Sequence, residues 1–195
     1  MENRGEGIFI QFDSSVISSW EARKEVVDYE VVLKAGFDKW KAEHPMSEMK
    51  FPGMPYIMLH SLSHLLITAI ALECGYSASA IKERVYSIGG VGHGILLYTG
   101  SSDAEGTLGG LIQVGRNIHE HMRAALRYGE LCSNDPVCAS HVPANEYENR
   151  FLHGAACHGC LLIAETSCEM YNNYLDRNLV VNTLENVNAE FFNFK

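Results

Sequence analysis

The stretch PYIMLHSLSHLLITAIALECG, Pro55 to Gly75, is apolar on almost every side when it is drawn as a helix. Proline is favoured in the first turn of a helix, and glycine is favoured just past the last turn. A helix that is hydrophobic all round is usually buried in a core. Histidine and serine interrupt the apolar run before it reaches the roughly 18 residues that span a bilayer. We therefore predict a buried core helix, with Cys74 as a core residue near its end.

The segment before this helix predicts a strand and a long helix. Residues 7–12, GIFIQF, alternate enough to form a short strand. Ser18 and Glu21 have the spacing of a capping box, which marks a helix start. Apolar residues at helical spacing then continue to about His44, and Pro45 opens a loop.

The segment after the core helix predicts further helices and one strand. Ser77 is a candidate cap for a helix through ASAIKERVYS. A glycine-rich turn follows at residues 89–94, and Ile95 to Thr99 read as a strand. The sequence LIQVGRNIHEHMRAALRYGELC then fits one or two helices that end near Cys132.

Near the C-terminus, Thr166 and Glu169 form another possible capping box, which would open a helix through CEMYNNYLDR. The LVV that follows is a strand or a helix extension. The fold class is therefore α/β or α+β, helix-rich, with a small sheet, packed helices and a loop-rich C-terminal segment. We expect one domain over residues 1–195, divided into an N-terminal strand and long helix (1–52) and a core with the cysteines (53–195).

Charge and the N-terminus restrict the class of protein. The formal net charge is −9, and a free-standing nucleic-acid binder is usually basic, because neutralising phosphates supplies much of its affinity. The sequence MENRGEG lacks the apolar core of a secretion signal, which indicates the cytoplasm. Thiols stay reduced there, so structural disulfides account less well for the cysteines.

Five of the six cysteines lie within 37 residues of the C-terminal half. Cys157 and Cys160 form C-x2-C, the tight turn by which two thiolates reach one tetrahedral zinc ion. Two further ligands would close the site. We expect Zn²⁺ to be bound by four of these five: Cys132, Cys138, Cys157, Cys160 and Cys168.

The cysteine cluster also allows alternatives to a site of four thiolates. Cys168 would lie at a helix N-terminus, where the dipole favours a thiolate. Three histidines, at positions 141, 153 and 158, are substitute ligands. A redox pair is less favoured, because that motif should follow a strand and open a helix. Ordinary packing of buried thiols is the remaining alternative.

A second group of residues supports a different class, a metal-dependent hydrolase or nuclease. His60 and His64 lie four residues apart, on one face of the core helix. Asp103 and Glu105 lie in a glycine-rich loop after a strand and are a candidate carboxylate pair. Hydrogen-bonded core histidines and solvated carboxylates are the simpler interpretation. The sequence contains no G-x-x-x-x-G-K-[ST], so nothing in it indicates ATP hydrolysis.

Arg116, Arg123 and Arg127 fall near helical spacing and are candidate DNA contacts on one basic stripe. A solvated helix face accounts for the same spacing. The acidic balance of the whole chain favours the solvated face, or a DNA contact made through a complex.

Several motifs together resemble a known family. HSLSHLLI (60–67), GILLYTGSSDAEGTLGGL (94–111), CSNDPVC and CHGCLLIAETSCEMYNNYLDR are similar to a helicase-associated zinc-binding domain of unknown function. This domain occurs at the C-terminal end of some superfamily 2 helicases, as in MrfA, and in DrmB of the DISARM anti-phage system. The resemblance covers about residues 60–181.

The resemblance implies a zinc-binding cysteine cluster and an accessory role beside a DEAD/DEAH-type helicase in prokaryotic anti-phage defence or DNA repair. It implies a non-catalytic subunit that scaffolds a partner helicase or assists its engagement of DNA. The spacing of seven residues between Cys160 and Cys168 is longer than the family pattern, so the resemblance does not fix which four cysteines bind the metal.

Overall fold

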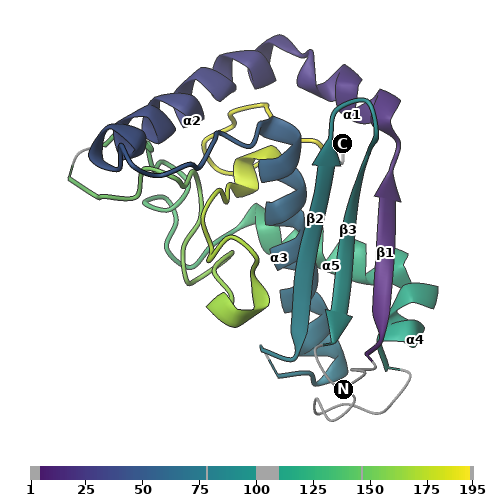
Figure 1. The fold of residues 1–195 in the computed structure, drawn as a ribbon. Helices are drawn as coiled ribbons and strands as arrows, with labels where there is room; N and C mark the ends of the chain where they lie inside the picture. Colours follow the sequence, from purple (N-terminus) through teal and green to yellow (C-terminus); the bar gives the residue numbers. More distant parts are fainter. Residues whose placement is uncertain (1–4, 78, 100–109, 146, 194–195) are drawn as a thin grey trace.

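The computed structural model describes residues 5–77, 79–99, 110–145 and 147–193. In these residues a central helix, α3 (Met54–Cys74), lies behind a small sheet and beside a loop-rich C-terminal segment (Figure 1). The predicted buried core helix is confirmed, because nearly every side chain from Met54 to Ile70 is buried. Gly75 ends it in a left-handed conformation, with φ of 72°. The prediction for Cys74 is wrong, since its side chain is exposed.

By length and composition α3 is apolar enough to cross a membrane, despite its histidines and serines. Its most apolar window has a mean hydropathy of 1.6, and 72% of that window is buried inside the protein. The core of a folded domain therefore accounts for its composition. The serine hydroxyls are satisfied internally; Ser61 Oγ donates to the carbonyl oxygen of Ile57 at 2.8 Å.

The sheet has three antiparallel strands in the order β1-β3-β2. They are β1 (Gly7–Phe12), β2 (Ile81–Ile88) and β3 (Gly92–Thr99). Ile10 pairs with Ile95, and Ile95 pairs with Val85 on its other side. Ile95 and Val85 are buried on the face that packs against α3. On the opposite face, the Phe9 and Tyr86 rings meet edge to face at 5.9 Å.

The helix predicted through residues 78–87 is wrong, because residues 81–88 form strand β2. Ile81, Glu83 and Val85 are buried, while Arg84 and Tyr86 are exposed. This is the period of two that a half-buried strand has. The sequence does not show this pattern clearly, because at position 83 a carboxylate occupies a place that faces the core.

The N-terminal helix is divided into α1 (Ser14–Glu21) and α2 (Lys24–Glu43). The chain becomes helical earlier than the predicted start at Ser18, because Asp13 caps α1 by accepting a hydrogen bond from the amide of Ser15 at 2.8 Å. The two helices are separated at Arg23, which is extended.

Two helices, α4 (Gly110–Arg116) and α5 (Ile118–Glu130), follow β3 in the described residues. Beyond them the regular elements are two short 3-10 helices, η1 (Glu165–Ser167) and η2 (Arg177–Leu179). The helix predicted to open at residue 166 is wrong. Tyr171, Asn172 and Tyr174 have φ between 52° and 62°, the left-handed region, which cannot continue a right-handed helix.

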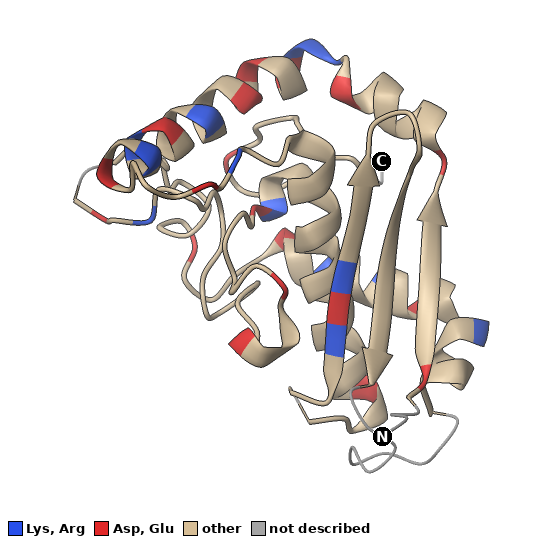
Figure 2. Cartoon of the chain, in the orientation of Figure 1, with Lys and Arg blue, Asp and Glu red and all other residues tan. Residues whose placement is uncertain are grey.

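Helix α2 connects the top of the sheet to the loop-rich segment (Figure 1). Lys39 Nζ donates to the carbonyl oxygen of Ala144 at 2.7 Å. Tyr29 donates its hydroxyl to Asp176 at 2.7 Å. Both signs of charge alternate along this helix (Figure 2). The N-terminal helix therefore braces the segment that carries the cysteines.

Candidate metal centre

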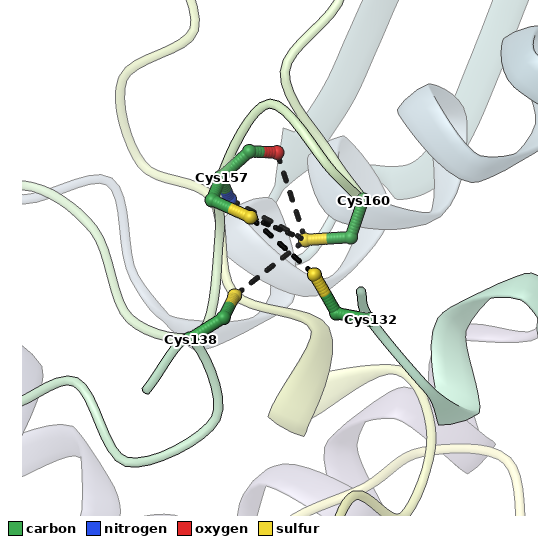
Figure 3. A group of neighbouring side chains, drawn as sticks. All are labelled: Cys132, Cys138, Cys157 and Cys160. Carbon is green, nitrogen blue, oxygen red and sulfur yellow. Dashed lines mark hydrogen bonds between the residues drawn. The ribbon is translucent and has the colours of Figure 1, made fainter. Parts of the chain in front are cut away.

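Four cysteines from two separate turns direct their sulfur atoms to one point (Figure 3). All four sulfurs lie within 4.8 Å of one another. The first turn directly follows α5, and the first cysteine of the second turn lies 25 residues after that of the first. The cysteines are Cys132 and Cys138 in the first turn, and Cys157 and Cys160 in the second.

The separations between the sulfurs match those around a tetrahedral zinc ion. Zinc–sulfur bonds of about 2.3 Å place neighbouring sulfurs about 3.8 Å apart. Cys132 lies 3.4 Å from Cys157, and Cys138 lies 3.7 Å from Cys160. Cys157 and Cys160 are 3.8 Å apart. No disulfide joins these thiols.

The first turn is built by a buried ion pair. Asp135 accepts hydrogen bonds from the amide of Cys132 at 2.9 Å and from that of Ala139 at 3.1 Å. Arg177, whose side chain is fully buried, pairs with the same carboxylate. Its guanidinium also donates to the carbonyl oxygen of Gly129 at 3.1 Å, which satisfies the end of α5.

The second turn packs closely against the first at Gly159. The amide of Gly159 donates to the sulfur of Cys157 at 3.3 Å. A Cβ added at Gly159 would lie 2.7 Å from Ser133 Oγ and 3.2 Å from the sulfur of Cys132. A side chain at position 159 would therefore require the Ser133 hydroxyl to shift.

The electrostatic environment favours a thiolate at Cys157 but disfavours one at Cys132 and Cys138. Although burial raises it, hydrogen bonds from Asn134 and Cys132 lower the pKa of Cys157 to about 7. The hydrogen bond with Cys160 and then burial raise the pKa of Cys138, so two neighbouring thiolates are disfavoured without a cation. A bound divalent ion removes that conflict, since a coordinating thiol loses its proton. Although burial opposes it, the charge of Cys138 and then Cys160 raises the pKa of Arg177.

The donor set therefore fits Zn²⁺, and four thiolates around one ion form a closed site. A closed site holds segments together and has no coordination position open to water or a substrate. Here it would tie the end of α5 to the turn at residues 157–160.

Cys168 lies outside this cluster. It follows η1 and is not at the start of a helix, and its sulfur lies 3.1 Å from Nε2 of His60. The three substitute histidines do not belong to this cluster either. His141 contacts Glu148 at 2.5 Å, His153 donates to the carbonyl oxygen of Asn172 at 2.7 Å, and His158 is exposed.

The candidate hydrolase residues are only partly described. Asp103 and Glu105 fall outside the residues that the structure describes. His60 and His64 are fully buried and face Glu83 and Cys168. Sequence reasoning missed Glu83. The period-two pattern of residues 81–85 was the signal that could have found it, because that pattern places a carboxylate on the core side.

The three candidate arginines lie on two helices. Arg116 ends α4, whereas Arg123 and Arg127 lie one turn apart on α5. All three are exposed. Arg123 pairs with Glu120 at 3.0 Å, which reduces its availability to a phosphate.

Comparison with known proteins identifies the family. The family model of the MrfA Zn-binding domain matches residues 62–161, a range that contains all four clustered cysteines. The chain belongs to this family. The matched range ends one residue beyond Cys160, so Cys168 and His60 lie outside it.

A curated relative extends the likeness to nearly the whole chain. The DISARM protein DrmB of Bacillus paralicheniformis is 41% identical in an alignment of 195 positions, which covers 98% of this chain and 34% of that protein. The chain thus spans about a third of the length of this relative. The zinc-binding family and the four-cysteine cluster together indicate zinc as the metal.

Proposed function

We propose that this chain is a non-catalytic, zinc-stabilised accessory part of a prokaryotic anti-phage defence complex, in which a superfamily 2 helicase is its partner. The identity of 41% with DrmB along nearly the whole chain is the observation that carries the proposal. The family is named after MrfA. The motifs at residues 60–67 and 94–111 and the two cysteine-rich stretches resemble the C-terminal end of that helicase. The helicase partner and the scaffolding role are our extension of these likenesses.

The geometry supports a structural role for the metal. Four sulfurs would fill the coordination sphere of the ion. The ion would therefore stabilise the two turns that hold it and would not activate water. The sequence has no P-loop lysine motif, so the energy for translocation on DNA would come from the partner. The reduced thiols fit the cytoplasm, where such a complex would meet phage DNA.

Contact with DNA, where it occurs, is proposed to take place within the complex. The net charge of −9 disfavours autonomous binding, although Arg123 and Arg127 present two exposed cations on α5. Together with Arg116 at the end of α4, they are the candidate positions at which the chain assists the helicase in holding a strand, and Arg123 would first have to leave its ion pair with Glu120. The hydrolase alternative gains no support from the described residues, in which both histidines are buried away from solvent.

The test is carried out in the native host. Deleting the gene should raise phage plating efficiency, and the wild-type gene or Cys74→Ser should restore protection, because Cys74 is exposed and away from the cluster. Cys138→Ser should fail to restore it. The tagged wild-type protein should co-purify with a superfamily 2 helicase in a fixed ratio. Unchanged plating after deletion, together with no helicase in the purified complex, would reject the proposal.

A further inference from the structure

A second group of potential metal ligands lies in the core, apart from the four clustered cysteines. It joins His60 and His64 of α3, Glu83 of β2 and Cys168 after η1. The ligand atoms of the four residues lie within 4.8 Å of one another. Both imidazoles and the carboxylate of Glu83 have side chains that are 0% exposed. Such a concentration of ionisable groups in a core needs a compensating partner.

Hydrogen bonds to the backbone orient both imidazoles. Nδ1 of His60 donates to the carbonyl oxygen of Tyr174 at 3.2 Å, and Nδ1 of His64 donates to that of Leu161 at 2.8 Å. A carbonyl oxygen can only accept, so the proton of each neutral ring is on Nδ1. The Nε2 lone pairs are left to point into the group. Metal-binding histidines are held in this way by their second nitrogen.

The remaining donors converge on the same space. Nε2 of His64 and Oε1 of Glu83 are buried and form no hydrogen bond, although Nε2 of His60 lies only 3.1 Å from that oxygen. Ser63 fixes the carboxylate by donating its hydroxyl to Oε2. The sulfur of Cys168 accepts a hydrogen bond from the backbone amide of Asn172 at 3.1 Å, and this hydrogen bond favours the thiolate.

We propose that His60, His64, Glu83 and Cys168 bind a second zinc ion in a closed, tetrahedral, structural site. Two imidazoles, one carboxylate and one thiolate are all zinc ligands, with bonds of about 2.0–2.3 Å. Such bonds separate neighbouring donor atoms by about 3.3–3.6 Å. The observed separations are 3.1 Å from His60 Nε2 to the sulfur of Cys168, 3.1 Å from His60 Nε2 to Glu83 Oε1, and 3.7 Å from His64 Nε2 to Glu83 Oε1.

The alternative is a proton on an imidazole, shared with Glu83. Such a proton accounts for a single hydrogen bond, because it lies on the line between one imidazole nitrogen and one acceptor atom. It leaves the lone pair of His64 Nε2 buried without a partner. A single divalent ion satisfies all four donors together. The site would join α3, β2 and the C-terminal segment, three parts that the four-cysteine site does not connect.

This proposal does not depend on the proposed role in defence. The first test uses the unaltered wild-type chain, expressed with zinc in the medium and purified under reducing conditions. We expect two zinc ions per chain by elemental analysis. X-ray absorption at the zinc edge should show nitrogen or oxygen at about 2.0–2.1 Å beside sulfur at about 2.3 Å. One zinc per chain with a pure sulfur shell would overturn the proposal.

The second test uses variants. Cys168→Ser should reduce the content to one zinc per chain and leave a sulfur-only shell, while the matched control Cys74→Ser should keep two. An unchanged zinc content in soluble Cys168→Ser would also overturn the proposal. If this variant is insoluble, the wild-type absorption spectrum decides the question, since it needs no substitution.

Discussion

Cys138 is the residue whose removal isolates the four-cysteine site. Cys138→Ser deletes one of four sulfurs and leaves three thiols in a partly buried place, so we expect zinc content to fall by one ion per chain. We expect the free energy of unfolding to fall by roughly 3–5 kcal/mol, because loss of a metal is among the mechanisms behind the largest single-residue effects. Elemental analysis and denaturant unfolding measure both quantities. Cys74→Ser should change neither, and an equal loss in that control would contradict the assignment.

His153 gives a pH prediction. Burial lowers the pKa of His153 from 6.5 to about 4, so the unfolded chain takes up this proton first. The stability contribution is therefore complete above pH 6.5 and is lost as the pH falls toward 4. Between pH 7 and pH 5 the wild-type protein should lose about 1–2 kcal/mol more than His153→Gln.

The control for this prediction is His119→Gln, because His119 has an exposed side chain. Protonation of the metal ligands affects wild type, His153→Gln and His119→Gln alike. The difference in pH-dependent stability between wild type and His153→Gln therefore reports on His153 alone. Identical pH profiles for wild type and His153→Gln would show that folding does not lower the pKa of His153, which would contradict the prediction.

For single residues, the sequence indicated that cysteines are the metal ligands more clearly than it indicated which four cysteines form the site. The C-x2-C pair of Cys157 and Cys160 was recognisable, because two thiols two residues apart reach one ion through local geometry. The other two ligands could not be chosen from spacing. Cys168 is only eight residues beyond Cys160, yet the left-handed turns after it place its sulfur against His60.

Helix α2 approaches the C-terminal segment so closely that it requires glycine at position 36. A Cβ there would lie 2.4 Å from the carbonyl oxygen of Phe151 and 2.5 Å from Pro143 Cβ. Alanine favours a helix by about 1 kcal/mol over glycine, but this clash should exceed that gain. We expect Gly36→Ala to lower the free energy of unfolding by about 1–3 kcal/mol.

Gly115 of α4 is the matched helical control. Its added Cβ would meet Ile8 at 3.5 Å or more, an ordinary contact. Gly115→Ala should therefore be neutral or stabilise by up to about 1 kcal/mol. Denaturant unfolding of both variants is the measurement. Equal stabilisation by the two substitutions would show that α2 does not pack as described.

Among the elements, those with a strong local pattern were predictable. Helix α3 was found because it is apolar on all sides, and β1 because it alternates. Strand β2 was mistaken for a helix, because nothing in the nearby sequence shows that the carboxylate of Glu83 faces the core. The side chains that Glu83 meets there belong to α3 and Cys168, which are distant in the sequence. Within the C-terminal segment, residues 166–177 were mistaken for a helix, because positive φ angles at Tyr171 and Asn172 overrule their cap-like pattern.

For the whole molecule, charge predicts how the chain meets DNA. With a net charge of −9, the isolated chain should bind a double-stranded oligonucleotide at physiological salt with a Kd weaker than about 10⁻⁴ M, the weak end of non-specific binding. Fluorescence anisotropy across a salt series measures this. Tight binding with a steep salt dependence would contradict the proposal that DNA is met only within a complex.

The central claim is that two distant turns close on one zinc ion and thereby order the segment that contains them. Hydrogen–deuterium exchange of the wild-type protein, before and after zinc removal by a chelator, tests it most directly. We predict that amides of residues 132–139 and 157–161 lose protection on chelation, while those of β3 change less. Unchanged protection at both turns in protein that has lost its zinc would contradict the claim.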